Sequence, residues 1–143
     1  MTSADTIIDV TEEAEGSPSP EDLLTVHTRT VGAAVVIAAV GEIDMVTAPL
    51  LERAIAAESP QRDIVLDLTA VSFIGSTGLG LLLEANRRCH ESNRALPLVV
   101  GSQRAVIRTI TASGLAPVLS MRKSVSDALA QDFGQRHAET RPA

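Results

Sequence analysis

The strongest constraint on the fold is a change of hydrophobic period in the middle of the chain. Ile64–Leu68 is apolar apart from Asp67, which is typical of a strand covered on both faces. Helical periodicity begins only after Gly75, Ser76 and Thr77. The two hydroxyl residues are therefore expected at the N-terminus of a helix, where free N–H groups and the helix dipole stabilise negative charge.

The flanking sequence extends this strand–helix unit into an alternating series. Two apolar stretches joined at Val31 and Gly32 predict a hairpin, and each later predicted strand is followed by a helix. The predicted strands are 23–30, 33–40, 64–68, 96–100 and 118–121, and the predicted helices are 47–58, 77–92, 103–113 and 124–133. This order predicts a single α/β domain with a mixed, mostly parallel central sheet of four to five strands and about four helices.

Short-range signals predict details of these helices. Thr47 is expected to cap the first helix, and Ser76 taken alone is most simply the N-cap of the second. Residues 124–127 have the spacing of a capping box. Glu84 and Arg88 are four residues apart and are expected to pair on the exposed face of the second helix.

Charge divides the chain into a tail and a folded part. Residues 1–22 hold seven carboxylates and no Lys or Arg, whereas the rest of the chain has eleven acids and twelve bases. The tail also contains Ser-Pro-Ser-Pro at 17–20. We therefore expect a disordered acidic tail over 1–22, a folded domain over 23–133 and a polar C-terminal tail over 134–143.

Composition argues against several classes of protein. The only aromatic residues are two phenylalanines, so the stacking platforms used to bind nucleic acids are missing. The single Cys89 excludes an intramolecular disulfide framework, and three scattered histidines give no metal-ligand spacing. No apolar run is long enough to span a membrane, and the acidic N-terminus does not resemble a signal peptide. A cytoplasmic location without membrane insertion is expected.

The glycines around the hydroxyl pair do not form a nucleotide-binding loop. A P-loop needs Lys and then Ser or Thr where this chain has Leu81 and Leu82, and the dinucleotide fingerprint and the nucleophile elbow also fail on spacing. Gly78 and Gly80 each cost a helix about 1 kcal/mol relative to alanine, which predicts the close approach of a partner or another backbone. Because no general base, metal cluster or cofactor loop accompanies the hydroxyls, an enzyme is disfavoured.

Taken together, these pieces resemble the STAS family, specifically the bacterial anti-sigma factor antagonists. The resemblance covers about residues 23–133, and the order and separation of its parts are more specific than any one of them. The parts are Gly41-Glu-Ile-Asp44, Thr47-Ala-Pro49, Val65-Leu-Asp-Leu68, Ile74-Gly-Ser-Thr-Gly-Leu-Gly80, Ser113-Gly-Leu115 and 124–129.

The resemblance implies a partner-switching role. In such antagonists the serine before Ser/Thr-Gly-Leu-Gly is phosphorylated, and that position is Ser76 here. The unphosphorylated protein is expected to bind an anti-sigma factor that is also a serine kinase, and thereby to free a sigma factor for transcription. Phosphorylation ends the complex, and a serine phosphatase restores it. ATP and Mg²⁺ belong to the kinase, so this chain is expected to need no cofactor.

The expected partner-binding surface combines the hydroxyl junction with two nearby acids. Asp44 and Asp67 both follow strand-like runs and are expected at strand ends near Ser76, where they would repel a phosphate. An equally simple interpretation is that each acid caps a turn. The expected partner-binding residues are Asp44, Thr47, Asp67, Gly75, Ser76, Thr77, Gly78, Leu79 and Gly80.

One position departs from the pattern of the antagonists. The family usually has Asp immediately before the phosphorylated serine, and this chain has Gly75. This leaves open a second interpretation, a STAS subunit of a transporter or scaffold assembly that binds its partner without phosphorylation. The third interpretation, an enzyme, would be supported by a turnover that is lost in Ser76→Ala.

Overall fold

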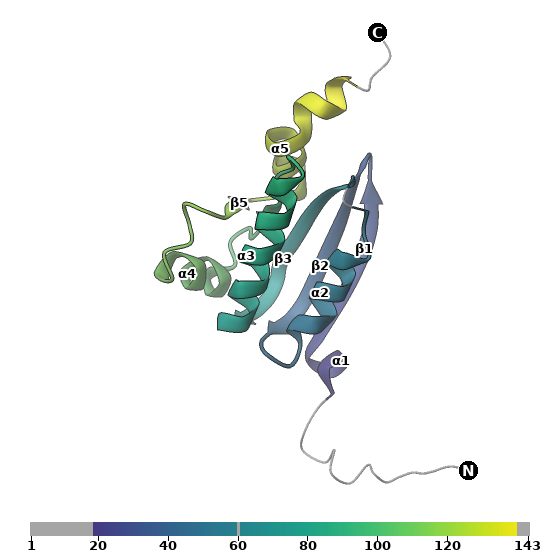
Figure 1. Cartoon of the computed structure of the whole chain (residues 1–143). Coiled ribbons are helices and arrows are strands. Elements are labelled where there is room, and N and C mark those ends of the chain that lie inside the picture. The colour runs from purple at the N-terminus through teal and green to yellow at the C-terminus, as the bar shows by residue number, and fades with distance from the viewer. Residues whose placement is uncertain (1–18, 60, 140–143) are drawn as a thin grey trace, which may run out of the picture.

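The computed structural model describes residues 19–59 and 61–139. Its elements are α1 Pro20–Leu23, β1 Leu24–Val31, β2 Ala34–Ile43, α2 Ala48–Ala56, β3 Asp63–Ile74, α3 Ser76–Glu91, β4 Pro97–Val99, α4 Arg104–Ala112, β5 Ser120–Arg122 and α5 Val125–Glu139 (Figure 1). This order confirms the predicted α/β domain with alternating strands and helices. The short α1 is the one element that the sequence patterns did not predict.

The strands form one mixed sheet in the order β1-β2-β3-β4-β5. β1 and β2 are antiparallel, and the pairing of Val31 with Ala34 leaves Gly32 and Ala33 as a two-residue turn. Gly32 has a φ of +59°, a left-handed conformation that glycine adopts at little cost. The other three strand pairs are parallel. The predicted hairpin and the mostly parallel sheet are both confirmed.

Helices cover the two faces of the sheet unequally. On one face, the odd-numbered β2 residues Val35 and Ile37 pack in a large aliphatic cluster with buried residues of α2, α3 and α4. On the other face, Val36 and Val65 pack against Ala128 and Phe133 of α5. Figure 1 shows α2 and α3 side by side in front of the sheet. The start of α3 is thereby held between β3 and α2.

β3 is longer than the predicted strand 64–68. It continues to Ile74, and its second half pairs with β2 through Val71 and Ile74, whereas β4 pairs only with Leu66 and Asp67. Because the second half has only one neighbouring strand, it tolerates exposed polar residues such as Ser72. The continuous apolar pattern used for the prediction therefore ends before the strand does.

The ends of the domain also differ from the predicted boundaries. α1 lies partly within the predicted acidic tail, and α5 continues to Glu139, past the predicted end at Phe133 and through Gly134. The rest of the two predicted tails, 1–18 and 140–143, lies outside the described residues. Among the residues that the structure describes, none of the helices is both long and apolar enough to cross a membrane.

Candidate functional site

Ser76 is the first residue of α3, directly after the end of β3. Gly75 is the N-cap, with extended backbone angles of φ −95° and ψ −176°. Its N–H donates to the Ile43 carbonyl at 2.9 Å, and its carbonyl accepts from the Leu79 N–H at 3.0 Å. The prediction that Ser76 is the N-cap is therefore wrong by one position, because Gly75 already makes the backbone bonds of the cap. The side chains of Ser76 and Thr77 are left exposed at the helix start.

The loop between β2 and α2 is held by a compact hydrogen-bond network. The Thr47 hydroxyl is fully buried, donates to the Glu42 carbonyl at 2.7 Å and accepts from the Asp44 N–H at 2.9 Å. One carboxylate oxygen of Asp44 accepts from the N–H groups of Val46 at 2.9 Å and Thr47 at 3.0 Å. Thr47 occupies the N-cap position of α2, but its side chain makes no capping bond. Asp44 instead supplies the local side-chain acceptor, and Thr47 ties the loop to β2.

These bonds fix the charge of the loop as well as its shape. The hydrogen bond from the backbone N–H of Thr47 is the main cause that lowers the pKa of Asp44 below its usual value. Desolvation acts in the opposite direction, and the hydrogen bond from the N–H of Val46 adds to the lowering. Asp44 follows the last residue of β2, so its predicted place at a strand end is confirmed. The loop therefore presents a fixed anionic group beside the carboxyl ends of the strands.

The β2–α2 loop and the start of α3 lie against each other. A Cβ atom added to Gly78 would lie 2.8 Å from both Ile43 Cγ2 and Ile74 Cγ1, and 3.3 Å from the Ile43 carbonyl oxygen. Only glycine allows α3 to pack this close to the ends of β2 and β3. The close approach predicted at Gly78 is thus confirmed, and the atoms that approach it belong to β2 and β3 of the same chain. Around Gly80, by contrast, an added Cβ would have no atom within 4 Å.

Asp67 is not part of this site. It lies inside β3, opposite Val99 of β4, and its carboxylate accepts from the Thr69 N–H at 3.0 Å and the Thr69 hydroxyl at 2.7 Å. It lies seven positions before Ile74, which corresponds to roughly 23 Å along a strand. The prediction that Asp67 ends its strand beside Ser76 is therefore wrong, because β3 is longer than its apolar core.

Three exposed apolar residues lie in the two segments that meet where the Gly75 N–H bonds the Ile43 carbonyl; we call them the apolar patch, and sequence reasoning did not single them out. The patch consists of Met45, Val46 and Phe73, with exposed fractions of 74%, 50% and 50%. The Phe73 ring lies 3.4 Å from where a Cβ of Gly75 would be. Two signals in the sequence pointed to the patch: Met45 and Val46 are apolar residues in a predicted turn, and Phe73 is adjacent to an inward-facing residue. Clustered apolar side chains of this kind are typical of protein-binding surfaces.

A shallow groove between α2 and α3 continues this surface. It has a volume of about 300 Å³ and is lined by Met45, Ala48, Pro49, Glu52, Thr77, Gly80, Leu81 and Glu84. Gly80 forms an open part of the groove, since it has no side chain and no neighbour in the space above it. The structure thus leaves room for another molecule next to Ser76.

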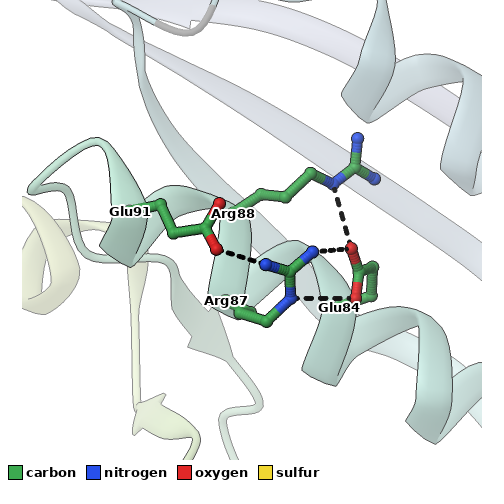
Figure 2. Close-up of polar contacts among 4 residues, drawn as sticks. All are labelled: Glu84, Arg87, Arg88 and Glu91. Atoms are coloured by element: carbon green, nitrogen blue, oxygen red, sulfur yellow. Dashed lines mark hydrogen bonds and ion pairs between the residues drawn. The ribbon is translucent and has the colours of Figure 1, made fainter.

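One acidic rim residue of the groove belongs to an ion-pair network along α3. Figure 2 shows Glu84 in contact with Arg87 and Arg88, and Arg87 also in contact with Glu91. The predicted pair of Glu84 and Arg88 is present, with 3.7 Å between Nε and Oε2. The hydrogen bond from Arg87 is the main cause that lowers the pKa of the Glu84 carboxyl. The network orients the Glu84 carboxylate beside the groove.

The site combines a small number of chemical groups. Asp44 is the acid beside the junction, and its carboxylate oxygen already accepts hydrogen bonds from Val46 and Thr47. Within residues 19–59 and 61–139, no cluster of three or more His, Cys, Asp or Glu is placed to hold a metal ion. What the site offers is an exposed hydroxyl, an anionic loop and an apolar surface.

Comparisons with known proteins agree on the type of domain. The family model described as "STAS domain" matches residues 25–128. The anti-sigma-F factor antagonist RsfB of Mycobacterium tuberculosis is 33% identical over 121 residues, which cover 82% of this chain and 97% of that protein. The crystal structure of an anti-sigma factor antagonist from Mycobacterium paratuberculosis is also 33% identical, with a TM-score of 0.68, and the match covers 79% of this chain and 97% of that one.

A more distant structure supports the fold alone. The anti-sigma factor antagonist SpoIIAA in its unphosphorylated form is 22% identical, with a TM-score of 0.59. The match covers 75% of this chain and 95% of that one. The five-stranded mixed sheet with its surrounding helices is therefore shared well beyond the range of clear sequence similarity.

Proposed function

The chain belongs to the STAS domain family, and on that premise we propose that it is an anti-sigma factor antagonist switched by phosphorylation of Ser76. In its unphosphorylated form it binds an anti-sigma factor that has serine kinase activity, and a sigma factor is released. The observation that carries this proposal is the position of Ser76, which is exposed at the first residue of α3, beside the apolar patch Met45, Val46 and Phe73. The relatives named as anti-sigma factor antagonists support the same role.

The docking surface in this proposal consists of the apolar patch and the groove between α2 and α3. Burial of exposed apolar area contributes about 25 cal/mol per Å², so Met45 and Phe73 would be the main anchors for the partner. Gly80 allows the partner's backbone or side chains to approach α3 closely. Close approach of a partner would explain why a glycine with no internal packing role lies near the start of a helix.

The switch is electrostatic. A phosphate on Ser76 adds a charge of about −1.5 to −2, in a position next to the anionic loop of Asp44 and at the centre of the surface that the partner must cover. The N-terminus of α3 stabilises the phosphate within the free protein, whereas burying it in a complex costs several kcal/mol. About 5.5 kcal/mol is enough to invert a 99:1 population, so one phosphate is sufficient to separate the partners.

The corresponding cycle requires two other proteins. The anti-sigma factor supplies the kinase with its ATP and Mg²⁺, and a serine phosphatase removes the phosphate and restores binding. All of these components would meet this chain in the cytoplasm.

The experiment that tests the proposal is phosphate transfer from labelled ATP in a lysate of the cells that make this protein. We expect label on the wild-type chain, mapping of the label to Ser76, and its loss in Ser76→Ala. Thr77→Ala is the matched control, because Thr77 is equally exposed in the same turn. Absence of label on the wild type, with another antagonist labelled in parallel, would contradict the switch.

One residue favours a second candidate, a STAS protein-binding subunit of a transporter or scaffold assembly that needs no phosphorylation. Gly75 stands where the antagonists that this chain resembles have Asp. A side chain at this position would not clash with its neighbours, so packing does not require glycine there. A Cβ at this position would meet the Phe73 ring at 3.4 Å, an ordinary contact distance, and its φ of −95° suits any residue. A stable complex that is indifferent to ATP and to Ser76 substitutions would support this candidate.

A further inference from the structure

A separate pocket lies at the far end of α3 from Ser76. It has a volume of about 340 Å³ and is bounded by the C-terminal ends of α2 and α3 and by the start of β3. The 16 residues of α3 span about 24 Å, which separates this pocket from the docking surface. We call it the helix-end pocket; its lining residues are Ile55, Ala56, Glu58, Ser59, Arg62, Ile64, Ala85, Arg88, Cys89, Glu91, Ser92 and Arg94.

The floor of the helix-end pocket is apolar. Ile55 and Ile64 are buried core residues, Ala85 is 2% exposed, and Cys89 is half-buried. Burial is the main cause that raises the pKa of the Cys89 thiol above its usual value, so this side chain is a neutral, apolar part of the surface near pH 7. A floor of this kind receives a hydrocarbon group and not a charged one.

The rim of the pocket is rich in guanidinium groups. Arg94 is paired with the buried carboxylate of Asp63, and this pair fixes one guanidinium beside the floor. Arg88 is held only by Glu84 at 3.7 Å, with both side chains about half exposed. Arg62 has no salt bridge among the residues that the structure describes. Two of the three arginines are thus available to a new anion.

The lining of the pocket also contains two acids, Glu58 and Glu91. Glu91 is engaged by Arg87, which lies outside the pocket. Glu58 is the remaining acid of the lining, which also includes Arg62 and Arg88. The lining as a whole therefore holds three arginines and two glutamates, and Arg62 is the arginine without a salt bridge among the described residues.

We propose that the helix-end pocket binds a small organic carboxylate with an apolar body, whose carboxylate is held by Arg62 and Arg88 and whose body lies on Ile55, Ile64, Ala85 and Cys89. Guanidinium groups bind carboxylates through paired, charge-assisted hydrogen bonds. The volume is at the small end of the roughly 300–1,000 Å³ range of ligand pockets, which fits a metabolite of modest size and not a dinucleotide.

The test is a ¹H–¹⁵N NMR titration of the full chain with 1-naphthoate, compared with its neutral amide, 1-naphthamide. We expect saturable shifts at the amides of Ile64, Ala85 and Cys89 with naphthoate, and binding of naphthamide that is weaker by about tenfold or more, since charge-assisted hydrogen bonds contribute about 1.5–3 kcal/mol. Arg62→Gln and Arg88→Gln should each weaken naphthoate binding. Arg108→Gln on α4, an exposed arginine outside the pocket, should leave it unchanged.

Cys89 provides an independent readout, because it is the only cysteine in the chain. Naphthoate should slow its alkylation by neutral iodoacetamide in the wild type and have less effect in Arg88→Gln. The proposal is overturned by the absence of saturable shifts, by equal affinities for the acid and the amide, or by shifts centred on Met45 and Phe73 instead of the pocket. None of these results depends on whether Ser76 is phosphorylated.

Discussion

At the scale of single residues, the two glycines in the first half of α3 have opposite roles. Gly78 is required by the fold, since a methyl group there would lie 2.8 Å from Ile43 and Ile74. Gly80 has open space around it and lies in the groove between α2 and α3. The same residue type, two positions apart, thus serves internal packing in one case and, in our proposal, the approach of a partner in the other.

This difference predicts opposite effects of alanine at the two positions. Gly78→Ala should lower the free energy of unfolding by about 1–3 kcal/mol, as expected for overpacking. Gly80→Ala should raise it by about 0.5–1 kcal/mol through helix propensity, while weakening the binding of the partner. Urea unfolding of the two variants and of the wild type measures the first effect. If Gly80→Ala changed neither stability nor binding, the assignment of Gly80 to the docking surface would have to be dropped.

Asp44 gives a prediction for the pH dependence of stability. Hydrogen bonds from Thr47 and Val46 lower the pKa of its carboxyl in the folded protein, so they stabilise the fold only while the carboxyl is ionised. This contribution is present above the unfolded-state pKa of about 3.8 and is lost as the pH falls through the lower folded-state pKa. Asp44→Ala should therefore be less stable than the wild type at neutral pH.

The measurement for Asp44 is the melting temperature of both proteins as a function of pH. The difference between wild type and Asp44→Ala should be constant near neutral pH and should shrink below about pH 3.8. Glu52→Ala is the control, because Glu52 is exposed on α2 and lies outside the hydrogen-bond network of the loop. A difference that persisted undiminished in acid would mean that packing, and not the ionised carboxylate, accounts for the effect.

At the scale of elements, one ion pair joins the last strand to the last helix. Arg122 of β5 donates two hydrogen bonds to Asp132 of α5, from Nε at 2.8 Å and from Nη2 at 2.9 Å. The Asp132 side chain is only 8% exposed. β5 has three residues, all half-buried, so this paired contact is the main polar link that positions α5 on the second face of the sheet.

Breaking this pair should therefore cost more than breaking a surface pair. Arg122→Met should lower the free energy of unfolding by about 2–3 kcal/mol, because it leaves a nearly buried carboxylate without its partner. Arg87→Met is the matched control and should have a much smaller effect on stability, since Arg87 and its partners are about half exposed. Denaturant unfolding measures both values. Equal costs would show that burial of Asp132 does not strengthen the link.

Elements were predicted well where an apolar pattern coincided with the whole element. The order of strands and helices and the hairpin turn at Gly32 followed from such patterns. β3 was predicted too short because its second half pairs on one side only and carries exposed residues such as Ser72. This error alone displaced Asp67 from the predicted site, since the strand end was assumed to lie several residues too early.

At the scale of the whole molecule, sequence patterns located the region of the proposed switch but not the exposed apolar residues around it. They placed Ser76 and Thr77 at the start of a helix and Asp44 at a strand end, and the structure confirms both positions. They did not predict the grouping of Met45, Val46 and Phe73, because these residues come from two separate segments whose proximity depends on tertiary packing. The helix-end pocket was missed for the same reason, as its arginines are spread over three segments.

The two proposed functions lie at the two ends of α3. The start of the helix carries the proposed phosphorylation site and docking surface, and its end forms one wall of the helix-end pocket. The rest of the domain holds α3 in place through the aliphatic core beneath it. The central claim concerns the start of α3, namely that one phosphate on Ser76 decides whether the partner is bound.

The most direct measurement of that claim is the calorimetric affinity of the kinase-type anti-sigma factor for this chain with and without phosphate on Ser76. We predict that the unphosphorylated chain and Ser76→Ala bind with similar affinity. Phosphorylation should weaken binding by at least about 100-fold, equivalent to about 2.7 kcal/mol, and Ser76→Glu should lose most of the affinity. Equal affinities for the phosphorylated and unphosphorylated chains would contradict the account.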